Sequence, residues 1–314
     1  MYKIFVDGQE GTTGLQINER LLKHSGIEIL KIDNERRKDV ELKRKFLNEA
    51  DIVFLCLPDD ASRESVSLVT NERTCIIDAS TAHRTNPDWA YGFPELKGQR
   101  ERIRNSKRIA VPGCYATGFV ALMYPLVQEG LVQKEYPVTL HAVSGYSGGG
   151  KKLISQYESD SPQKGALVAP RPYAAKLNHK HLPEMQKIVG LDFTPLFTPL
   201  VCNYYKGMAV MVPLLRRLLP KKSSAKEIHD FLSGYYQSEQ FVKVLPFETD
   251  QSTENGYINV VASNDSNRND ICVFHNDEQI VLVSRLDNLG KGASGAAVQC
   301  MNIVCGCDEG MGLL

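Results

Sequence analysis

Lys3-Ile-Phe-Val-Asp-Gly-Gln-Glu-Gly-Thr-Thr-Gly14 is the segment that decides the fold of this chain. Its first five residues form a short apolar strand pattern, and a helical pattern follows the last glycine and continues to His24. A glycine-rich turn between a strand and a helix lets the backbone approach a pyrophosphate at the helix N-terminus. The segment therefore predicts the start of a nucleotide-binding domain, and a plain tight turn is the alternative interpretation.

The same rhythm of strands and helices continues along the first part of the chain. Further apolar strand patterns occupy residues 28–32, 51–57, 75–78 and 108–111, and helical patterns occupy residues 41–48, 60–70 and 115–129. Strands that are continuous apolar runs are typical of a parallel sheet covered by helices on both faces. We therefore predict an α/β domain with a doubly wound parallel, Rossmann-like sheet.

After about residue 140 the pattern changes, and strands follow one another with few helices between them. The strand patterns occupy residues 138–143, 193–200, 208–214, 241–245, 257–262, 271–275 and 279–286. The clearest helix of this half covers residues 223–236, with Ser223 as its expected N-cap. This half predicts an α+β domain with a mixed or antiparallel sheet, and a small-residue helix pattern follows at 291–305.

Composition bounds the class of protein. A chain of 314 residues with 42% hydrophobic residues suits two globular domains. Lys+Arg and Asp+Glu both number 37, so the balanced charge gives no support to binding of nucleic acid or an anionic membrane. Most of the eight cysteines lie in apolar contexts, typical of reduced thiols, and no cysteine–histidine spacing predicts a metal site. We expect a cytoplasmic protein.

Cys114 has the most informative local context of any single residue. A strand pattern ends at Val111-Pro-Gly113, and a long helical pattern begins directly after the cysteine. A thiol at the first turn of a helix meets free N–H groups and the positive end of the helix dipole, which favour a thiolate. The same N–H groups can hold an oxyanion beside the sulfur. Cys114 is therefore a candidate nucleophile, and the alternative is a small buried apolar residue.

Two signals after the second strand concern the nucleotide, and they conflict. Asp33 stands at about the distance from the glycine turn where an acidic residue binds the ribose 2′-hydroxyl of NAD. Arg36 and Arg37 begin three residues further on, and guanidinium groups there suit the 2′-phosphate of NADP. The residues alone leave both nucleotides open.

A second glycine cluster, Ser144-Gly-Tyr-Ser-Gly148-Gly-Gly-Lys151, follows a strand pattern. Its small residues and successive N–H groups would let a substrate or a nicotinamide lie against the backbone. Lys151 would neutralise a phosphate. A flexible turn between domains has the same local pattern.

The histidines with the best context for proton transfer lie in Asn178-His179-Lys-His181-Leu-Pro-Glu184. A histidine with a pKa near neutrality can accept or donate a proton, and Glu184 would orient it if a helix starts here. Solvent-exposed surface histidines are the alternative.

Ser80-Thr-Ala-His-Arg84 follows the strand at 75–78, at the carboxyl edge where open α/β sheets bind ligands. Arg84 would clamp a phosphate or a carboxylate there. A structural salt bridge is an equally common use of such an arginine.

Taken together, these motifs resemble the N-acetyl-gamma-glutamyl-phosphate reductase family, in its shorter subgroup. The matching segments run in the family's order over nearly the whole chain: residues 7–15, 78–84, 91–95, 112–117, 144–149, 179–184 and 291–295. The resemblance implies an NADP-dependent enzyme of arginine biosynthesis that reduces an acyl phosphate to an aldehyde through a cysteine thioester.

The resemblance also implies roles for individual residues. It casts Cys114 as the nucleophile and His181 as the acid/base, with Glu184 orienting His181 and His179 as the alternative histidine. The implied cofactor-binding residues are Gly8, Gly11, Thr12, Thr13, Gly14, Arg36, Arg37, Ser144, Gly145 and Gly148. The implied substrate-binding residues are Ser80, Arg84, Lys151 and His179.

A discontinuous domain organisation and a homo-oligomer, either dimer or tetramer, follow from the same resemblance. It implies an NADP-binding domain of residues 1–115 and 291–314, and a catalytic and oligomerisation domain of residues 116–290. Three competing functions remain: aspartate-semialdehyde dehydrogenase, a reductase of carrier-bound aminoadipyl or glutamyl phosphate, and a non-catalytic NADP sensor. The Pro-Gly-Cys-Tyr-Ala-Thr context favours the glutamyl enzyme, and a sensor would show damaged cysteine or histidine motifs, which this sequence does not.

Overall fold

The computed structural model describes residues 1–36, 39–159, 164–247 and 249–313, which form two compact units. The first unit contains residues 1–113 and 293–314, and the second contains residues 114–292. Cys114 is thus the first residue of the second unit, and Gly292 is its last. Along the described ranges, every helix is too short or too polar to cross a membrane.

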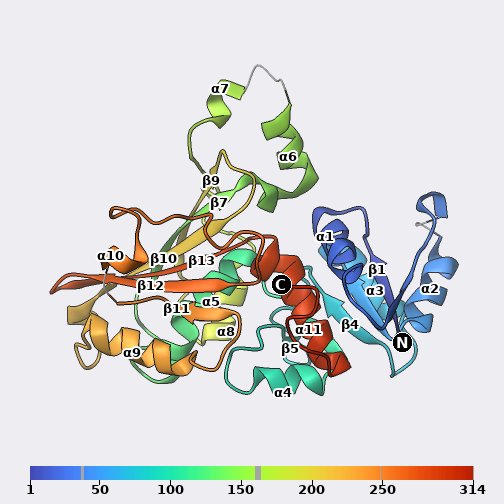
Figure 1. Cartoon of the computed structure of the whole chain (residues 1–314), viewed down its shortest axis with the longest axis horizontal. Coiled ribbons are helices and arrows are strands. Elements are labelled where there is room, and N and C mark those ends of the chain that lie inside the picture. The colour runs from blue at the N-terminus through green and yellow to red at the C-terminus, as the bar shows by residue number, and fades with distance from the viewer. Residues whose placement is uncertain (37–38, 160–163, 248, 314) are drawn as a thin grey trace. The chain divides into compact units, whose positions relative to one another are not determined.

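The first unit is built on a six-stranded sheet in the order β2-β1-β3-β4-β6-β5, with every pairing parallel (Figure 1). Its strands are β1 (Tyr2–Asp7), β2 (Ile27–Leu30), β3 (Ile52–Leu55), β4 (Cys75–Asp78), β5 (Ala90–Tyr91) and β6 (Arg108–Ala110). Its helices are α1 (Thr12–Leu21), α2 (Val40–Glu49), α3 (Asp59–Leu68), α4 (Gln99–Arg104) and α11 (Gly295–Cys305), with a 3-10 turn η1 (Asn34–Arg36). The predicted doubly wound parallel sheet is confirmed.

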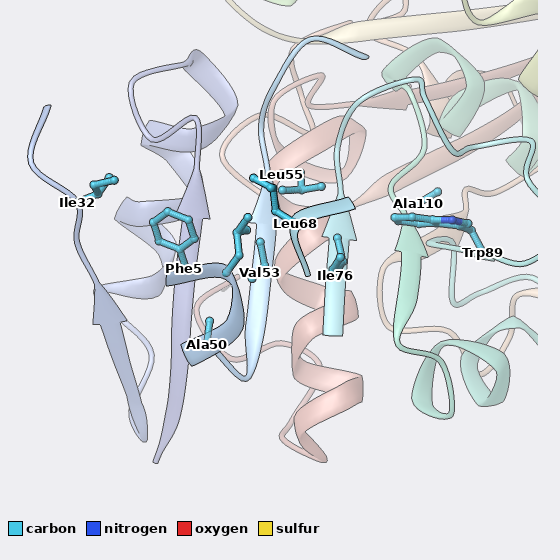
Figure 2. Close-up of a cluster of buried hydrophobic side chains, with 10 residues drawn as sticks. Phe5, Ile32, Ala50, Val53, Leu55, Leu68, Ile76, Trp89 and Ala110 are labelled. Carbon is cyan, nitrogen blue, oxygen red and sulfur yellow. The ribbon is translucent and has the colours of Figure 1, made fainter. Parts of the chain in front are cut away.

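Strand register explains the apolar runs that predicted this sheet. Phe5 on β1 lies opposite Val53 on β3, and Val53 lies opposite Ile76 on β4, so these side chains share one face. Leu47 from α2 belongs to the same buried cluster. Leu68 from α3 also belongs to it (Figure 2). Each such side chain contributes roughly 1.5–3 kcal/mol on burial, which fixes the sheet and the glycine turn at the end of β1.

The second unit is built on a seven-stranded mixed sheet in the order β11-β12-β13-β10-β7-β9-β8. Its strands are β7 (Thr139–Gly145), β8 (Arg171–Pro172), β9 (Leu196–Cys202), β10 (Met208–Leu215), β11 (Val242–Val244), β12 (Asn269–His275) and β13 (Gln279–Leu286). Its helices are α5 (Cys114–Gln128), α6 (Gly150–Glu158), α7 (Lys164–Leu167), α8 (Leu182–Val189), α9 (Ala225–Tyr235) and α10 (Thr249–Ser252). Short turns η2 (Tyr146–Gly149) and η3 (Arg216–Leu218) and the π-helix η4 (Gly290–Ser294) complete the elements. The predicted α+β class is confirmed.

Helix α5 lies in the interior of the second unit. It contacts helices α8 and α9 and strands β10 and β13, and nearly all of its residues are buried. A helix that is apolar on all sides belongs in a core. Gly118 allows a close approach, because a Cβ there would lie 2.7 Å from Cγ2 of Val210. The position of Cys114 at the start of α5 is therefore fixed by core packing.

Two sequence predictions are wrong in detail. Residues 257–262 form no strand: an isolated bridge joins Glu254 to Tyr257, and turns follow. Their apolar side chains Ile258 and Val260 instead pack against a buried cluster that contains Ala209. The N-cap of α9 is Ser224 rather than Ser223, because Ser224 forms a reciprocal capping box with Glu227.

The capping box gives a test of the α9 boundary. We expect Ser224→Ala to lower the free energy of unfolding of the second unit by about 1 kcal/mol, because the Glu227 N–H loses its side-chain acceptor. Urea unfolding followed by circular dichroism measures this loss. Ser238→Ala, at an exposed position beyond the helix, is the control, and an equal effect of both changes would contradict the assignment.

Candidate active site

Cys114 is the first residue of α5 and is half-buried. The main chain at Gly292 lies directly against it, since a Cβ at Gly292 would come within 2.8 Å of the Cys114 Cβ and 3.2 Å of its Cα. Only glycine permits that approach without displacement of the neighbouring chain. The small-residue segment at 291–295 thus contains a residue, Gly292, whose main chain approaches Cys114 closely.

Several other cysteines differ from Cys114 in their surroundings. Burial raises the pKa of Cys75 to about 12 and that of Cys272 to about 11. Burial likewise raises the pKa of Cys305 to about 12. These thiols stay protonated near neutral pH and are poor nucleophiles. Cys114 stands instead at a helix start, where main-chain N–H groups favour an anion.

The histidine motif packs against Tyr115, the residue that follows Cys114. The Tyr115 ring lies edge-on to the His179 ring, with 5.6 Å between the ring centroids. The centroid of the His181 ring lies 5.9 Å from that of Tyr115. Phe197 on β9 contacts both Tyr115 and His179 at 5.1 Å. The second unit therefore brings together two motifs that are far apart in sequence.

Hydrogen bonds continue through this cluster. The His181 N–H donates to Nδ1 of His179 at 3.2 Å, which leaves the Nε2 of neutral His179 as the protonated ring nitrogen. That Nε2 lies 3.5 Å from the Tyr173 hydroxyl, which shares a 3.0 Å hydrogen bond with the Tyr115 hydroxyl. The side chains of His179, Tyr173 and Tyr115 thus form one polar path within an aromatic cluster, which begins at the His181 main-chain N–H.

His179, Tyr173 and Tyr115 are uncharged near neutral pH. Burial lowers the pKa of His179 to about 4, and Lys180 contributes in the same direction. Burial raises the pKa of Tyr173 to about 12, and the negative charge of a Cys114 thiolate adds to that shift. Burial also places the pKa of Tyr115 well above its usual value. His179 and both tyrosines are therefore neutral neighbours of the sulfur.

His181 and Glu184 lie at the start of α8, the helix start on which the sequence interpretation depended. His181 occupies the N-cap position and Glu184 the first turn. Their side chains are only 5% and 2% exposed, so His181 is not a solvent-exposed surface histidine. A carboxylate in the first turn is also favoured by the helix dipole.

Ser144 and Gly145 end strand β7 close to the same cluster. Burial raises the pKa of the Tyr115 hydroxyl, and the nearby Ser144 acts in the opposite direction. The Gly145 N–H donates to the Gly207 carbonyl at 2.9 Å, and a Cβ at Gly145 would lie 2.6 Å from the Tyr205 carbonyl oxygen. The strand end is thus held by main-chain contacts that require glycine at position 145.

Gly148, in the same glycine cluster, is less constrained. A Cβ at Gly148 would make only ordinary contacts, the nearest at 3.5 Å to the Asn288 amide nitrogen. Lys151 is exposed in the first turn of α6. The structure thus brings Ser144 to the Cys114 neighbourhood, whereas Lys151 stays on the surface of the second unit.

In the first unit, the glycine turn leaves no room for a side chain at Gly8 or at Gly14. Gly8 has a φ of +88°, and a Cβ there would lie 2.3 Å from the Cys56 carbonyl oxygen. A Cβ at Gly14 would lie 2.4 Å from the Gly8 carbonyl oxygen. Helix α1 begins at Thr12 with Gly11 as N-cap, so no side chain caps its first N–H groups. Such a turn fits the phosphates of a dinucleotide.

The residues after β2 lie beside this turn. The Gln9 side chain donates to the Ile32 carbonyl at 3.3 Å, which ties the turn to the end of the second strand segment. Asp33 and Arg36 are exposed, and Arg36 pairs with Asp39 at 2.7 Å. Arg37 lies outside the described residues. The segment is thus placed where a ribose-binding residue is expected, with its guanidinium group at the surface.

Ser80 bonds a buried carboxylate at the end of β4, and Arg84 bonds the main chain that precedes Cys114. Ser80 Oγ donates to the buried Asp78 at 2.7 Å, and His83 bonds the same carboxylate oxygen at 2.6 Å. The buried Arg84 guanidinium donates to the carbonyls of Val111 and Ala79 at 2.9 and 3.0 Å. Arg84 thereby braces the strand end that leads to Cys114, and its binding of a phosphate stays a prediction.

Comparisons with known proteins agree with this architecture. Residues 3–106 match the family described as semialdehyde dehydrogenase, NAD binding domain, and residues 114–288 match the semialdehyde dehydrogenase, dimerisation domain. The solved aspartate semialdehyde dehydrogenase of Francisella tularensis superposes with a TM-score of 0.73 at 16% identity, covering 97% of this chain and 100% of that one. That of Vibrio cholerae gives 0.71 at 14%, covering 97% and 98%. The fold and both domains thus define a semialdehyde dehydrogenase.

Curated relatives narrow the class. N-acetyl-gamma-glutamyl-phosphate reductase 2 of Nostoc sp. is 47% identical over 99% of both chains. The N-acetyl-gamma-glutamyl-phosphate reductase of Brucella anthropi is 45% identical over 97% of this chain and 98% of its own. The chain belongs to the N-acetyl-gamma-glutamyl-phosphate reductase family. This confirms the resemblance found in the motifs, and with it an oxidoreductase that uses a nicotinamide cofactor.

Sequence reasoning missed three neighbours of the cluster: Tyr173, Phe197 and Asp287. Tyr173 follows the two-residue strand β8, and Phe197 lies on β9, so only sheet register brings them to Tyr115. Neither had a local signal. Asp287 had one, since an aspartate directly after a strand and before a Gly-rich segment is typical of a side chain that bonds the following main chain.

The close packing at Gly14 in the glycine turn can be tested with a matched pair of variants. We expect Gly14→Ala to weaken NADPH binding by about tenfold and to lower thermal stability, since its Cβ meets a backbone oxygen at 2.4 Å. Gly234→Ala, in helix α9, is the control, because its Cβ would meet no atom within 4 Å. Fluorescence titration with NADPH and melting curves measure both. Equal loss in both variants would show that the close approach at Gly14 is not what matters.

Proposed function

We propose that this chain reduces N-acetyl-L-glutamyl 5-phosphate to N-acetyl-L-glutamate 5-semialdehyde, with release of phosphate, in arginine biosynthesis. The observation that supports this most is the thiol at the start of a buried helix, with the His179–His181 motif packed against its neighbour Tyr115. The family membership supplies the substrate class, because its curated members are reductases of that acyl phosphate.

The cofactor we propose is NADP. Gly8, Gly11 and Gly14 with the first residues of α1, Thr12 and Thr13, would hold its phosphates. Arg36 and Arg37 would bind the 2′-phosphate, and Ser144, Gly145 and Gly148 would line the nicotinamide end. Bound NADPH supplies a hydride for the acyl carbon. The support for the phosphate role is the uncapped N-terminus of α1 behind a turn that excludes side chains at Gly8 and Gly14.

Covalent chemistry belongs to Cys114. Its thiolate attacks the acyl carbonyl carbon, a C–S bond forms, and the C–O bond to phosphate breaks with release of inorganic phosphate. N–H groups at the start of α5 would stabilise the oxyanion formed during this exchange. After reduction of the thioester, the C–S bond of the thiohemiacetal breaks, its electron pair returns to sulfur, and the aldehyde leaves.

Proton handling belongs to the histidine motif. His181 would donate a proton to the developing oxyanion and take it back when the thiohemiacetal collapses, and Glu184 would orient the ring. His179 is a neutral hydrogen-bonding residue, since burial holds its pKa at about 4. We propose it as a substrate contact together with Ser80, Arg84 and Lys151.

We extend the proposal to organisation and location. Residues 1–115 and 291–314 would form the NADP-binding domain, and residues 116–290 the catalytic and oligomerisation domain of a homodimer or homotetramer. The match of residues 114–288 to a dimerisation domain supports the oligomer. A cytoplasmic location would fit the half-buried thiol at the start of α5, which needs a reducing compartment.

The reverse reaction tests the function directly. We expect the protein to reduce NADP in the presence of phosphate and N-acetylglutamate semialdehyde, and Cys114→Ser to lower kcat by about 10⁴-fold or more because no thioester forms. Absorbance at the NADPH band measures the rate. Cys307→Ser, at another half-buried cysteine, is the control and should keep its rate. Turnover of aspartate semialdehyde without turnover of the acetylated aldehyde would refute the substrate assignment.

The coenzyme preference has a separate test. We expect Arg36→Ala to raise KM for NADPH by about tenfold and to leave KM for NADH nearly unchanged, because only NADPH carries the 2′-phosphate. Asp39→Asn is the companion variant, since it removes the partner of Arg36 and should not raise KM for NADPH. A loss that is equal for both coenzymes in Arg36→Ala would exclude the phosphate contact.

A further inference from the structure

The segment of residues 287–292, which follows β13, ends at the glycine that touches Cys114. Several main-chain groups of this segment bond to Asp287, which is 2% exposed. The Asp287 carboxylate accepts from the Leu289 N–H at 2.8 Å through Oδ1 and from the Asp265 N–H at 3.0 Å through Oδ2. Its main-chain carbonyl accepts from Gly290 at 3.1 Å and from Gly292 at 3.0 Å. One buried residue thus organises the whole turn.

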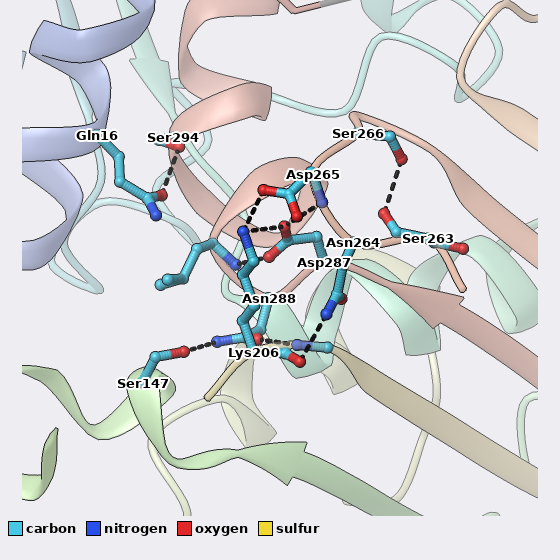
Figure 3. A network of polar contacts seen from close by, with 12 residues as sticks. Gln16, Ser147, Lys206, Ser263, Asn264, Asp265, Ser266, Asp287, Asn288 and Ser294 are labelled. Carbon is cyan, nitrogen blue, oxygen red and sulfur yellow. Dashed lines mark hydrogen bonds and ion pairs between the residues drawn. The ribbon is translucent and has the colours of Figure 1, made fainter. Parts of the chain in front are cut away.

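A lysine side chain lies near this carboxylate and partly balances its charge. Lys206 Nζ lies 4.0 Å from Asp287 Oδ2 and also pairs with the exposed Asp265 (Figure 3). The next residue is anchored as well, since Asn288 accepts from the Gly207 N–H at 2.8 Å and donates to Ser147 Oγ at 3.0 Å. Buried carboxylates persist where such bonds compensate their desolvation. The turn is therefore rigidly held on the β10 and η2 sides.

We propose that Asp287 is a positioning residue for Cys114, holding the Gly292 main chain against the nucleophile. The inference rests on the proposed function, in which Cys114 forms the thioester. Asp287 is linked to Cys114 through its main-chain carbonyl, which bonds Gly292, and through Gly292, whose main chain lies against the Cys114 Cβ. Loss of the carboxylate bonds would loosen the turn and let the Gly292 main chain withdraw.

Withdrawal of Gly292 has two opposite consequences. The half-buried thiol loses part of its cover, so a small alkylating agent reaches it faster. The substrate meets a nucleophile that is less well oriented, so turnover slows. A carboxylate that only stabilises the fold changes neither rate in the folded enzyme, and a group that activates the thiol would slow both rates when removed.

The experiment compares Asp287→Asn with Asp265→Asn. The control variant, Asp265→Asn, makes the same change of charge beside the same lysine and keeps the main-chain N–H of residue 265. Asparagine also tolerates the φ of +58° at this position. In Asp287→Asn we expect kcat to fall about tenfold with KM nearly unchanged. We expect iodoacetamide alkylation of Cys114, followed by peptide mass spectrometry, to accelerate about threefold. Both rates in Asp265→Asn should stay within about twofold of the unmodified protein.

Rates in Asp287→Asn that equal those of Asp265→Asn would overturn the proposal, and so would a fall in both rates. If Asp287→Asn does not fold, Asp287→Glu replaces it: the charge stays, but one extra methylene displaces both acceptor oxygens, and the same opposite changes are expected. A folded Asp287→Glu with unchanged rates overturns the proposal. The alkylation measurement needs no substrate, so a protein inactive on N-acetylglutamate semialdehyde would refute the proposed function and still leave Asp287 tested.

Discussion

The burial of helix α5 is the constraint on which the chemistry of the second unit depends. Because α5 is apolar on all sides and packs against α8, α9, β10 and β13, its first residue has no freedom to move. Cys114 therefore presents its thiol at a fixed helix start. The same core holds α8, whose N-cap is His181, so Cys114 and the histidine motif are positioned by one set of apolar contacts.

Glycines and histidines could be predicted from the sequence because their signals are local. A turn that requires Gly8 and Gly14 is visible in a strand–turn–helix pattern, and the helix start before Glu184 is visible in its proline and first-turn carboxylate. Strand order was not predictable to the same degree. The parallel class followed from the apolar runs, whereas the mixed order of the second sheet depends on pairings between distant segments.

Other features could not be predicted from the sequence, because a side chain can be buried in more than one way. The apolar residues at 257–262 satisfied the strand pattern, yet they cover a sheet face from a series of turns. Arg84 has the position of a ligand-binding arginine, and the structure shows its guanidinium bound to two carbonyls beside the strand end at Val111. Composition and periodicity do not distinguish a side chain that meets a ligand from one that meets the main chain.

The neutrality of the side chains around Cys114 affects the reactivity of a thiolate at this position. His179 and both tyrosines are uncharged near neutral pH, so the positive potential of the helix N-terminus acts on a sulfur whose neighbouring aromatic and imidazole groups add no charge of their own. Neutral partners stabilise the anion less than a cation would, so the thiolate keeps more of its nucleophilicity, because the reactivity of a thiolate falls as its pKa is lowered. The interaction energy of these neutral side chains with the negative charge also changes little when that charge moves from sulfur to an acyl oxygen. Such surroundings suit a reaction in which negative charge passes back and forth between one sulfur and one oxygen.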